Sequence, residues 1–189
     1  MMDKAGGVQG QAVVPGKYAR VERERRFLLA AAPSGSAVNE ARRIHDRYLV
    51  GTRLRLRRVE WAGGGCEFKL TQKVPAAGHG VVQGLITNTY LSAAEYDLLA
   101  SLPAAVLSKT RISVPPLGVD VFDGPLRGLV LAEAEFTTDE EAQLFVPPHQ
   151  CVAEVTEDAR STGGRLVETS RPLLLRWLAE YGIQPTIPR

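Results

Sequence analysis

Cationic side chains alternate with apolar ones in two short stretches of this sequence. Residues 53–57 read Arg-Leu-Arg-Leu-Arg, and lysines lie at positions 69 and 73. Successive side chains of a β-strand point to opposite faces of a sheet, so residues two apart share a face. The guanidinium fork of arginine binds phosphate oxygens in pairs, whereas lysine adds a mobile point charge. Two such cationic rows therefore predict a binding site for a polyphosphate.

Acidic side chains follow the same spacing elsewhere in the chain. Glu22 and Glu24 form one pair, and Glu133 and Glu135 form another. Two carboxylates on one strand face can share a hard cation such as Mg²⁺ or Mn²⁺, which also binds phosphate oxygens. The acidic pairs therefore predict a site for a divalent metal ion.

Alternation alone has an ordinary explanation, because any half-solvated antiparallel sheet shows it. The sorting of the charges by sign argues against that explanation here. Protein surfaces usually mix the two signs, since a row of like charges repels itself unless a counter-ion is bound. A metal–polyphosphate complex would satisfy both kinds of row, and its cation could supply the water that attacks a terminal phosphorus.

Eight period-two runs, separated by Gly, Pro, Ser or short helical patterns, predict an antiparallel fold that is mainly β. The predicted strands cover residues 17–29, 46–59, 65–74, 82–91, 106–114, 117–123, 127–137 and 150–157. We therefore expect an α+β protein, mainly β, built as an eight-stranded antiparallel β-barrel with a charged bore and flanking helices. The residues expected to point into that bore from five different strands are Glu24, Arg55, Lys73, Arg111 and Glu135.

Three helices are expected around this barrel. Residues 36–43 follow Pro33 and predict a short helix, and a capping box that begins at Ser92 predicts a second helix that ends before Pro103. Pro172 lies in the first turn of a C-terminal amphipathic helix, where its missing N–H costs nothing. The apolar stripe of that helix comprises Leu173, Leu174, Trp177 and Leu178.

Composition narrows the class of protein. A chain of 189 residues with 44% hydrophobic content suits one domain with a substantial core. The formal net charge of +2 offers no basic excess for a nucleic-acid partner. No stretch approaches the roughly 20 apolar residues of a membrane span, and the amino terminus lacks the apolar segment of a signal peptide. We therefore expect a disordered leader at 1–16 and a single cytoplasmic domain at 17–189, with no membrane partner. The sequence does not predict the oligomeric state.

An ordered series of motifs runs through most of the chain. Its main members are Glu22-Arg-Glu24-Arg-Arg26, Arg53-Leu-Arg55-Leu-Arg57, Lys109-Thr-Arg111, Asp120-Val-Phe122, Glu133-Ala-Glu135 and Glu154-Val-Thr156. This series resembles the CYTH superfamily, also called triphosphate tunnel metalloenzymes, whose hallmark is Glu-x-Glu-x-Lys near the amino end. No Gly-x-x-x-x-Gly-Lys-Ser/Thr motif is present, which excludes a P-loop enzyme.

The resemblance implies an eight-stranded tunnel and activity on a triphosphorylated substrate with Mg²⁺ or Mn²⁺ as cofactor. The metal ligands that it implies are Glu22, Glu24, Asp120, Glu133, Glu135 and Glu154. The substrate ligands that it implies are Arg26, Arg53, Arg55, Arg57, Lys69, Lys73, Lys109 and Arg111. The residues expected to matter most for catalysis are Glu22, Glu24, Arg55, Lys73 and Glu135.

Two features depart from the family pattern. Arg26 replaces the hallmark lysine, which preserves charge but not shape. The stretch Ser161-Thr-Gly-Gly164 replaces a Tyr-and-Asn pattern before the last helix.

The function expected first is metal-dependent hydrolysis of inorganic triphosphate to pyrophosphate and orthophosphate, because the chain has no obvious base-recognition module. Adenylate cyclisation, hydrolysis of a nucleoside or thiamine triphosphate, and non-catalytic binding of polyphosphate stay open as alternatives.

Overall fold

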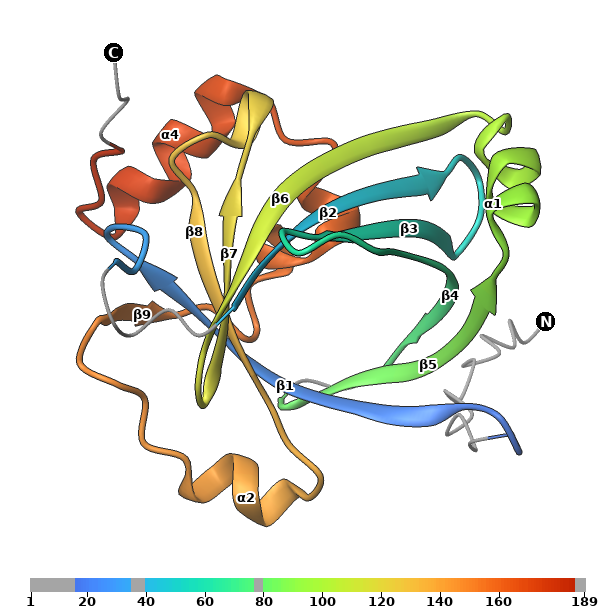
Figure 1. The fold of residues 1–189 in the computed structure, drawn as a ribbon. Helices are drawn as coiled ribbons and strands as arrows, with labels where there is room; N and C mark the ends of the chain where they lie inside the picture. The colour runs from blue at the N-terminus through green and yellow to red at the C-terminus, as the bar shows by residue number, and fades with distance from the viewer. Residues whose placement is uncertain (1–15, 35–39, 77–79, 186–189) are drawn as a thin grey trace, which may run out of the picture.

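The computed structural model describes residues 16–34, 40–76 and 80–185 (Figure 1). The strands in that part of the chain are β1 (Arg20–Leu29), β2 (Glu40–Leu49), β3 (Leu54–Trp61), β4 (Cys66–Pro75), β5 (Val82–Leu91), β6 (Ala104–Val114), β7 (Leu117–Phe122), β8 (Val130–Glu135) and β9 (Cys151–Glu154). The helices are α1 (Ala93–Ala100), α2 (Asp139–Leu144), α3 (Gly163–Leu166) and α4 (Arg171–Glu180), with 3₁₀ turns η2 (Gly124–Leu126) and η3 (Ala159–Ser161). The predicted leader, apart from Gly16, lies outside the described residues.

The sheet closes on itself as an eight-stranded antiparallel barrel. Its hydrogen-bonded order is β5-β4-β3-β2-β6-β7-β8-β1, and a further pairing of β1 with β5 completes the ring. β1 is shared among three neighbours, since residues 20–23 pair with β5, residues 24–28 with β8 and residues 27–29 with the short strand β9. The predicted eight-stranded barrel is therefore confirmed, but the strand expected at 150–157 is not one of its eight. That strand is β9, which pairs with the end of β1 beside the ring.

The second predicted strand, 46–59, is wrong as one element because it combines parts of two. β2 ends at Leu49 and β3 begins at Leu54, and Gly51 lies in the connecting turn with a φ of 72°. A positive φ strongly favours glycine, so this residue marks the break. The predicted helix at 36–43 is also wrong where it is described, because residues 40–43 open β2; residues 36–39 lie outside the described residues.

The predicted helices after Ser92 and Ser170 are confirmed. Ser92 and Glu95 form both hydrogen bonds of a capping box at the start of α1. In α4, Leu174, Trp177 and Leu178 are buried, whereas Leu173 is 49% exposed and does not belong to the apolar stripe.

Helix α4 packs against one end of the barrel, together with α3 (Figure 1). Leu28, Leu107, Phe122 and Leu131 project from the inner faces of four strands, and they form one cluster with apolar side chains of the C-terminal segment. The members of that segment in the cluster are Leu166, Leu174, Trp177, Leu178 and Ile183. Apolar packing thus fills this end of the barrel and leaves the charged rows to line the remaining space.

A second apolar cluster lies on the outer face of the barrel. Phe27, Val119 and Ala132 point away from the bore and pack with Phe136 and Phe145, which flank α2. Both faces of β1 are therefore in use: the outer face packs in this cluster, and the inner face carries polar side chains followed by Leu28 at the packed end of the barrel. None of the helices in the described part of the chain is long and apolar enough to cross a membrane.

Candidate functional site

The inside of the barrel holds a cavity of about 560 Å³ that all eight barrel strands line. The predicted site residues that line it are Glu22, Glu24, Arg26, Arg53, Arg55, Arg57, Lys69, Lys73, Lys109, Arg111, Glu133 and Glu135. The five residues expected to converge from five strands are all among them. Side chains separated by more than a hundred positions in the sequence therefore meet because the sheet closes.

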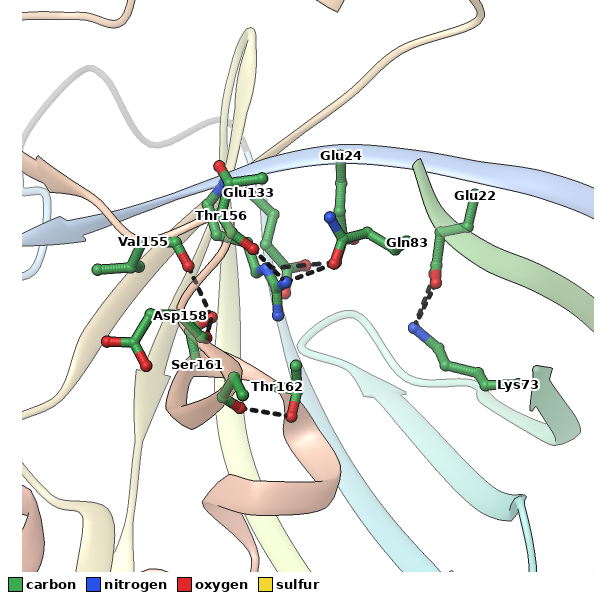
Figure 2. Close-up of polar contacts among 12 residues, drawn as sticks. Glu22, Glu24, Lys73, Gln83, Glu133, Val155, Thr156, Asp158, Ser161 and Thr162 are labelled. Carbon is green, nitrogen blue, oxygen red and sulfur yellow. Dashed lines mark hydrogen bonds and ion pairs between the residues drawn. The ribbon is translucent and has the colours of Figure 1, made fainter. Parts of the chain in front are cut away.

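Carboxylates gather on the β1 and β8 side of the cavity. Glu24 lies directly opposite Glu135 in the β1–β8 ladder, and Arg26 lies opposite Glu133. Glu22 accepts two hydrogen bonds from Lys73 Nζ at 2.7 and 2.8 Å, as Figure 2 shows. The period-two spacing on each strand brings the two acidic pairs to one wall.

Glu24 has an unusual environment for a carboxylate. Its burial, together with the nearby Glu133 and Glu22, raises its pKa to about 7, although Lys73 and Arg26 act in the opposite direction. The Arg26 Nε lies 3.7 Å from the Glu24 carboxylate, too far for a hydrogen bond. Glu24 is thus a buried acid that the protein alone does not stabilise as an anion.

This donor set fits a divalent cation in its chemistry. Mg²⁺ and Mn²⁺ prefer carboxylate oxygens, and a cation beside Glu24 would offset both the burial and the repulsion that raise its pKa. In residues 16–34, 40–76 and 80–185, no group of three or more His, Cys, Asp or Glu side chains is already arranged around one metal position. Glu22 is instead paired with Lys73, and Glu133 with Arg111.

Arginines gather on the β3 side of the same cavity. Arg57 donates from Nε and Nη2 to the two carboxylate oxygens of Asp46, at 2.6 and 2.7 Å. Arg55 donates to Thr71 Oγ1 at 3.3 Å, and its Nε has no hydrogen-bond partner within the described residues. The Nε of Arg26 is likewise buried without a partner there. Buried guanidinium N–H groups of this kind are ready donors for an anion.

Asp120 does not line the cavity, although it was predicted as a metal ligand. It is fully buried behind Lys109 and Arg111, which donate to its carboxylate at 2.5 Å and at 2.6 and 2.7 Å. Arg111 also binds Glu133. Burial alone would raise the pKa of Glu133, but Arg111, Lys109 and Lys73 outweigh it and lower that pKa. Asp120 therefore anchors two cations of the site.

Glu154 also lies away from the cavity, because it shares the outer face of the sheet with its partner on β1. It is opposite Phe27, which faces the outer core, and it forms a bidentate ion pair with Arg25 at 2.6 and 2.9 Å. Thr156 donates to the same carboxylate at 2.6 Å. Because it shares the outer face with Arg25, its predicted role as a metal ligand has no geometric support.

Several lining or supporting residues were missed in the sequence. Arg42, Asp46 and Tyr48 share the inner face of β2, and their period-two spacing was the available signal. The incorrect helix at 36–43 obscured it. No local pattern could have identified Gly163, because it matters through a tertiary contact. Its backbone lies so close to Tyr48 that a Cβ there would be 1.9 Å from the Tyr48 hydroxyl.

The pKa of Glu24 predicts an unusual pH dependence of stability. A pKa raised from 4.5 to about 7 on folding means that the contribution of Glu24 is fully present below pH 4.5 and is lost as pH rises through about 7. In metal-free buffer, the free energy of unfolding should therefore fall between about pH 5 and pH 8. Urea unfolding curves across this range, with a chelator present, would measure it; an increase in stability over the same interval would contradict the assignment.

Comparisons with known proteins agree with this geometry. The chain is 33% identical over 152 residues to an inorganic triphosphatase of Nitrosomonas europaea, a match that covers 74% of this chain and 91% of that protein. A crystal structure of the inorganic triphosphatase NE1496 has a TM-score of 0.52 and 28% identity, covering 78% of this chain and 95% of that one. Another crystal structure of NE1496, described as a hypothetical protein, has a TM-score of 0.53 and 29% identity. That match covers 79% of this chain and 99% of the other. No family model matches the chain.

Proposed function

Because the chain belongs to the CYTH superfamily of triphosphate tunnel metalloenzymes, we propose that it hydrolyses inorganic triphosphate to pyrophosphate and orthophosphate. The observation that carries the proposal is that cationic rows and acidic pairs line one cavity of about 560 Å³. A ligand that combines an anion with a cation matches both sets of side chains. The inorganic triphosphatase activity of a relative that aligns over most of its length supports the same choice.

The cations that line the cavity would bind the phosphate chain. Arg55 and Arg26 each keep a buried guanidinium Nε without a protein partner in the described ranges. Asp120 fixes Lys109 and Arg111 in place, and so reduces the side-chain entropy lost when they bind an anion. Lys73 is 40% exposed and can turn from Glu22 to a phosphate oxygen. Preorganised cations stabilise the charge that develops on the transferred phosphoryl group.

The acidic wall would hold the divalent cation. We assign this role to Glu22, Glu24, Glu133 and Glu135, and we propose Mg²⁺ or Mn²⁺ as the ion. When bound, such an ion would polarise phosphoryl oxygens and acidify a water molecule. Glu24 must give up its proton to bind a cation, because its pKa lies near 7 in the protein alone. Metal affinity should consequently increase as pH rises through that value.

A panel of substrates tests the proposal. Purified protein, treated with a chelator and then given Mg²⁺ or Mn²⁺, should release orthophosphate and pyrophosphate in equal amounts from inorganic triphosphate, and should be inactive with the chelator alone. The panel includes ATP, scored for cyclic AMP as well as phosphate, and thiamine triphosphate. Full activity without metal would contradict the role of the acidic wall. Preferential turnover of ATP or thiamine triphosphate would identify that compound, rather than inorganic triphosphate, as the substrate. Binding without turnover would indicate a polyphosphate-binding module.

A further inference from the structure

Asp46 is a fully buried acid placed among the cations of the site. It lies on β2, directly opposite Arg57 of β3, and none of its side chain reaches the cavity. Burial by itself would raise its pKa, but Arg57 and Arg55 outweigh this effect and lower it, so the carboxyl is ionised at neutral pH. A permanent negative charge therefore stands directly behind the arginine row.

The two arginines relate to Asp46 in different ways. Arg57 uses both Nε and Nη2 on the carboxylate, at 2.6 and 2.7 Å, and so is held by a bidentate ion pair. The Nε of Arg55 is 3.7 Å from the same carboxylate and makes no hydrogen bond to any described residue. Arg55 is oriented from its other end by Thr71, which in turn donates to Asn88 at 2.8 Å. Arg57 is thus largely neutralised, whereas Arg55 keeps free donors.

This arrangement matters because cations outnumber carboxylates in the cavity lining. An excess of positive charge would bind a triphosphate tightly, but it would also retain the pyrophosphate that forms from it. Tight binding of substrate and transition state alike does not raise kcat, and tight binding of product lowers it.

We propose that Asp46 is a charge-balancing residue that offsets the charge of Arg57 and Arg55 and so weakens anion binding enough for product to leave. The inference rests on the proposed function, since it presupposes a polyphosphate in the cavity. Asp46 does not touch substrate; it acts through the two guanidinium groups. If Asp46 served only to hold Arg57 in place, its loss would instead disorder that side chain and weaken anion binding.

Three variants separate these roles: Asp46→Asn, Arg57→Gln and the double variant, which replaces the ion pair by two amides. Pyrophosphate binding is measured by calorimetry with a chelator present, so that this measurement needs no metal ion. Asp46→Asn should bind pyrophosphate about tenfold more tightly, because it removes the negative charge that lies directly behind the arginine row. Arg57→Gln should bind it about tenfold more weakly, and the double variant should return to about the wild-type affinity.

Turnover provides the second measurement. In Asp46→Asn, kcat and KM for inorganic triphosphate should fall together, and acid-quenched samples should show a burst of product in the first turnover, since release becomes limiting. Glu180→Gln is the matched control, because it removes one carboxylate from an ion pair with Arg160 outside the cavity lining. It should change neither pyrophosphate affinity nor the burst.

The outcomes are separable. Weaker or unchanged pyrophosphate binding in Asp46→Asn would overturn the inference. If that variant does not fold, the comparison of the double variant with Arg57→Gln decides, since equal affinity of these two proteins would also overturn it. Failure of the wild-type protein to bind or hydrolyse inorganic triphosphate would instead contradict the proposed function.

Discussion

Replacement of Glu24 by glutamine should lower triphosphate turnover by about 10²- to 10³-fold and, in metal-free buffer, should stabilise the folded protein. Glutamine keeps the shape of the side chain but removes the charge that a hard cation needs. The same charge is unfavourable in the protein alone, because burial and neighbouring carboxylates raise the pKa of Glu24 from 4.5 to about 7. At pH 8 that difference corresponds to about 3 kcal/mol of stability, which the neutral amide would recover.

The measurements are kcat at several Mg²⁺ concentrations and urea unfolding with a chelator. Glu135→Gln is the matched comparison, because Glu135 faces Glu24 across the ladder but is exposed. It should lose turnover, recover part of it at high metal concentration, and gain no stability. A Glu24→Gln protein that is less stable than wild type in chelator at pH 8, or that hydrolyses triphosphate at the wild-type rate, would show that the acidic wall has been assigned incorrectly.

Arg55→Ala should lower kcat/KM for inorganic triphosphate by about ten- to hundredfold and leave the optimal metal concentration nearly unchanged. The loss corresponds to about 1.5 to 3 kcal/mol, the range for a hydrogen bond to a charged group. Among the described residues the Arg55 Nε has no hydrogen-bond partner, and its side chain is only 12% exposed, so its contact with phosphate would be shielded from water.

Arg55→Lys provides the sharper test of geometry. Lysine keeps the positive charge but cannot bind two oxygens with a planar fork, so it should restore only part of the activity that alanine loses. Thermal melts close to wild type would exclude unfolding as the cause. If Arg55→Ala folds normally and retains wild-type kcat/KM, or if its main defect is in metal dependence, Arg55 is not a phosphate ligand.

Much of the cavity could be predicted from the sequence because period-two spacing within one strand is a local property. The rows at 53–57 and 133–135 have charged side chains on one face and apolar ones on the other, and the apolar faces now pack in or around the barrel. The sorting of charge by sign then indicated which face is internal. The same argument failed for β2, because Arg42, Ile44, Asp46 and Tyr48 mix cation, apolar side chain, acid and phenol on one inner face.

Glu154 and Asp120 show a different limit. Alternation states which residues of a strand share a face, but it does not state whether that face is inside or outside. Glu154 is outside because of its register with Phe27, which is a contact across more than a hundred residues. Asp120 is on the inner face, yet Lys109 and Arg111 reach over it. Only the closed barrel determines which of two inward side chains lies in front.

The sharing of β1 among three neighbours has a consequence for the order of folding. This strand is synthesised first, but its partners β5, β8 and β9 lie roughly 60 to 130 residues later in the chain. Contacts of such sequence separation carry a large loop-closure entropy and slow folding. Glu22 and Glu24 are on β1, and they come close to Glu133 and Glu135 only when β1 pairs with β8. We therefore expect the acidic wall to assemble when the ring closes, so that a nascent chain cannot bind the cation at this site before the whole barrel has been made.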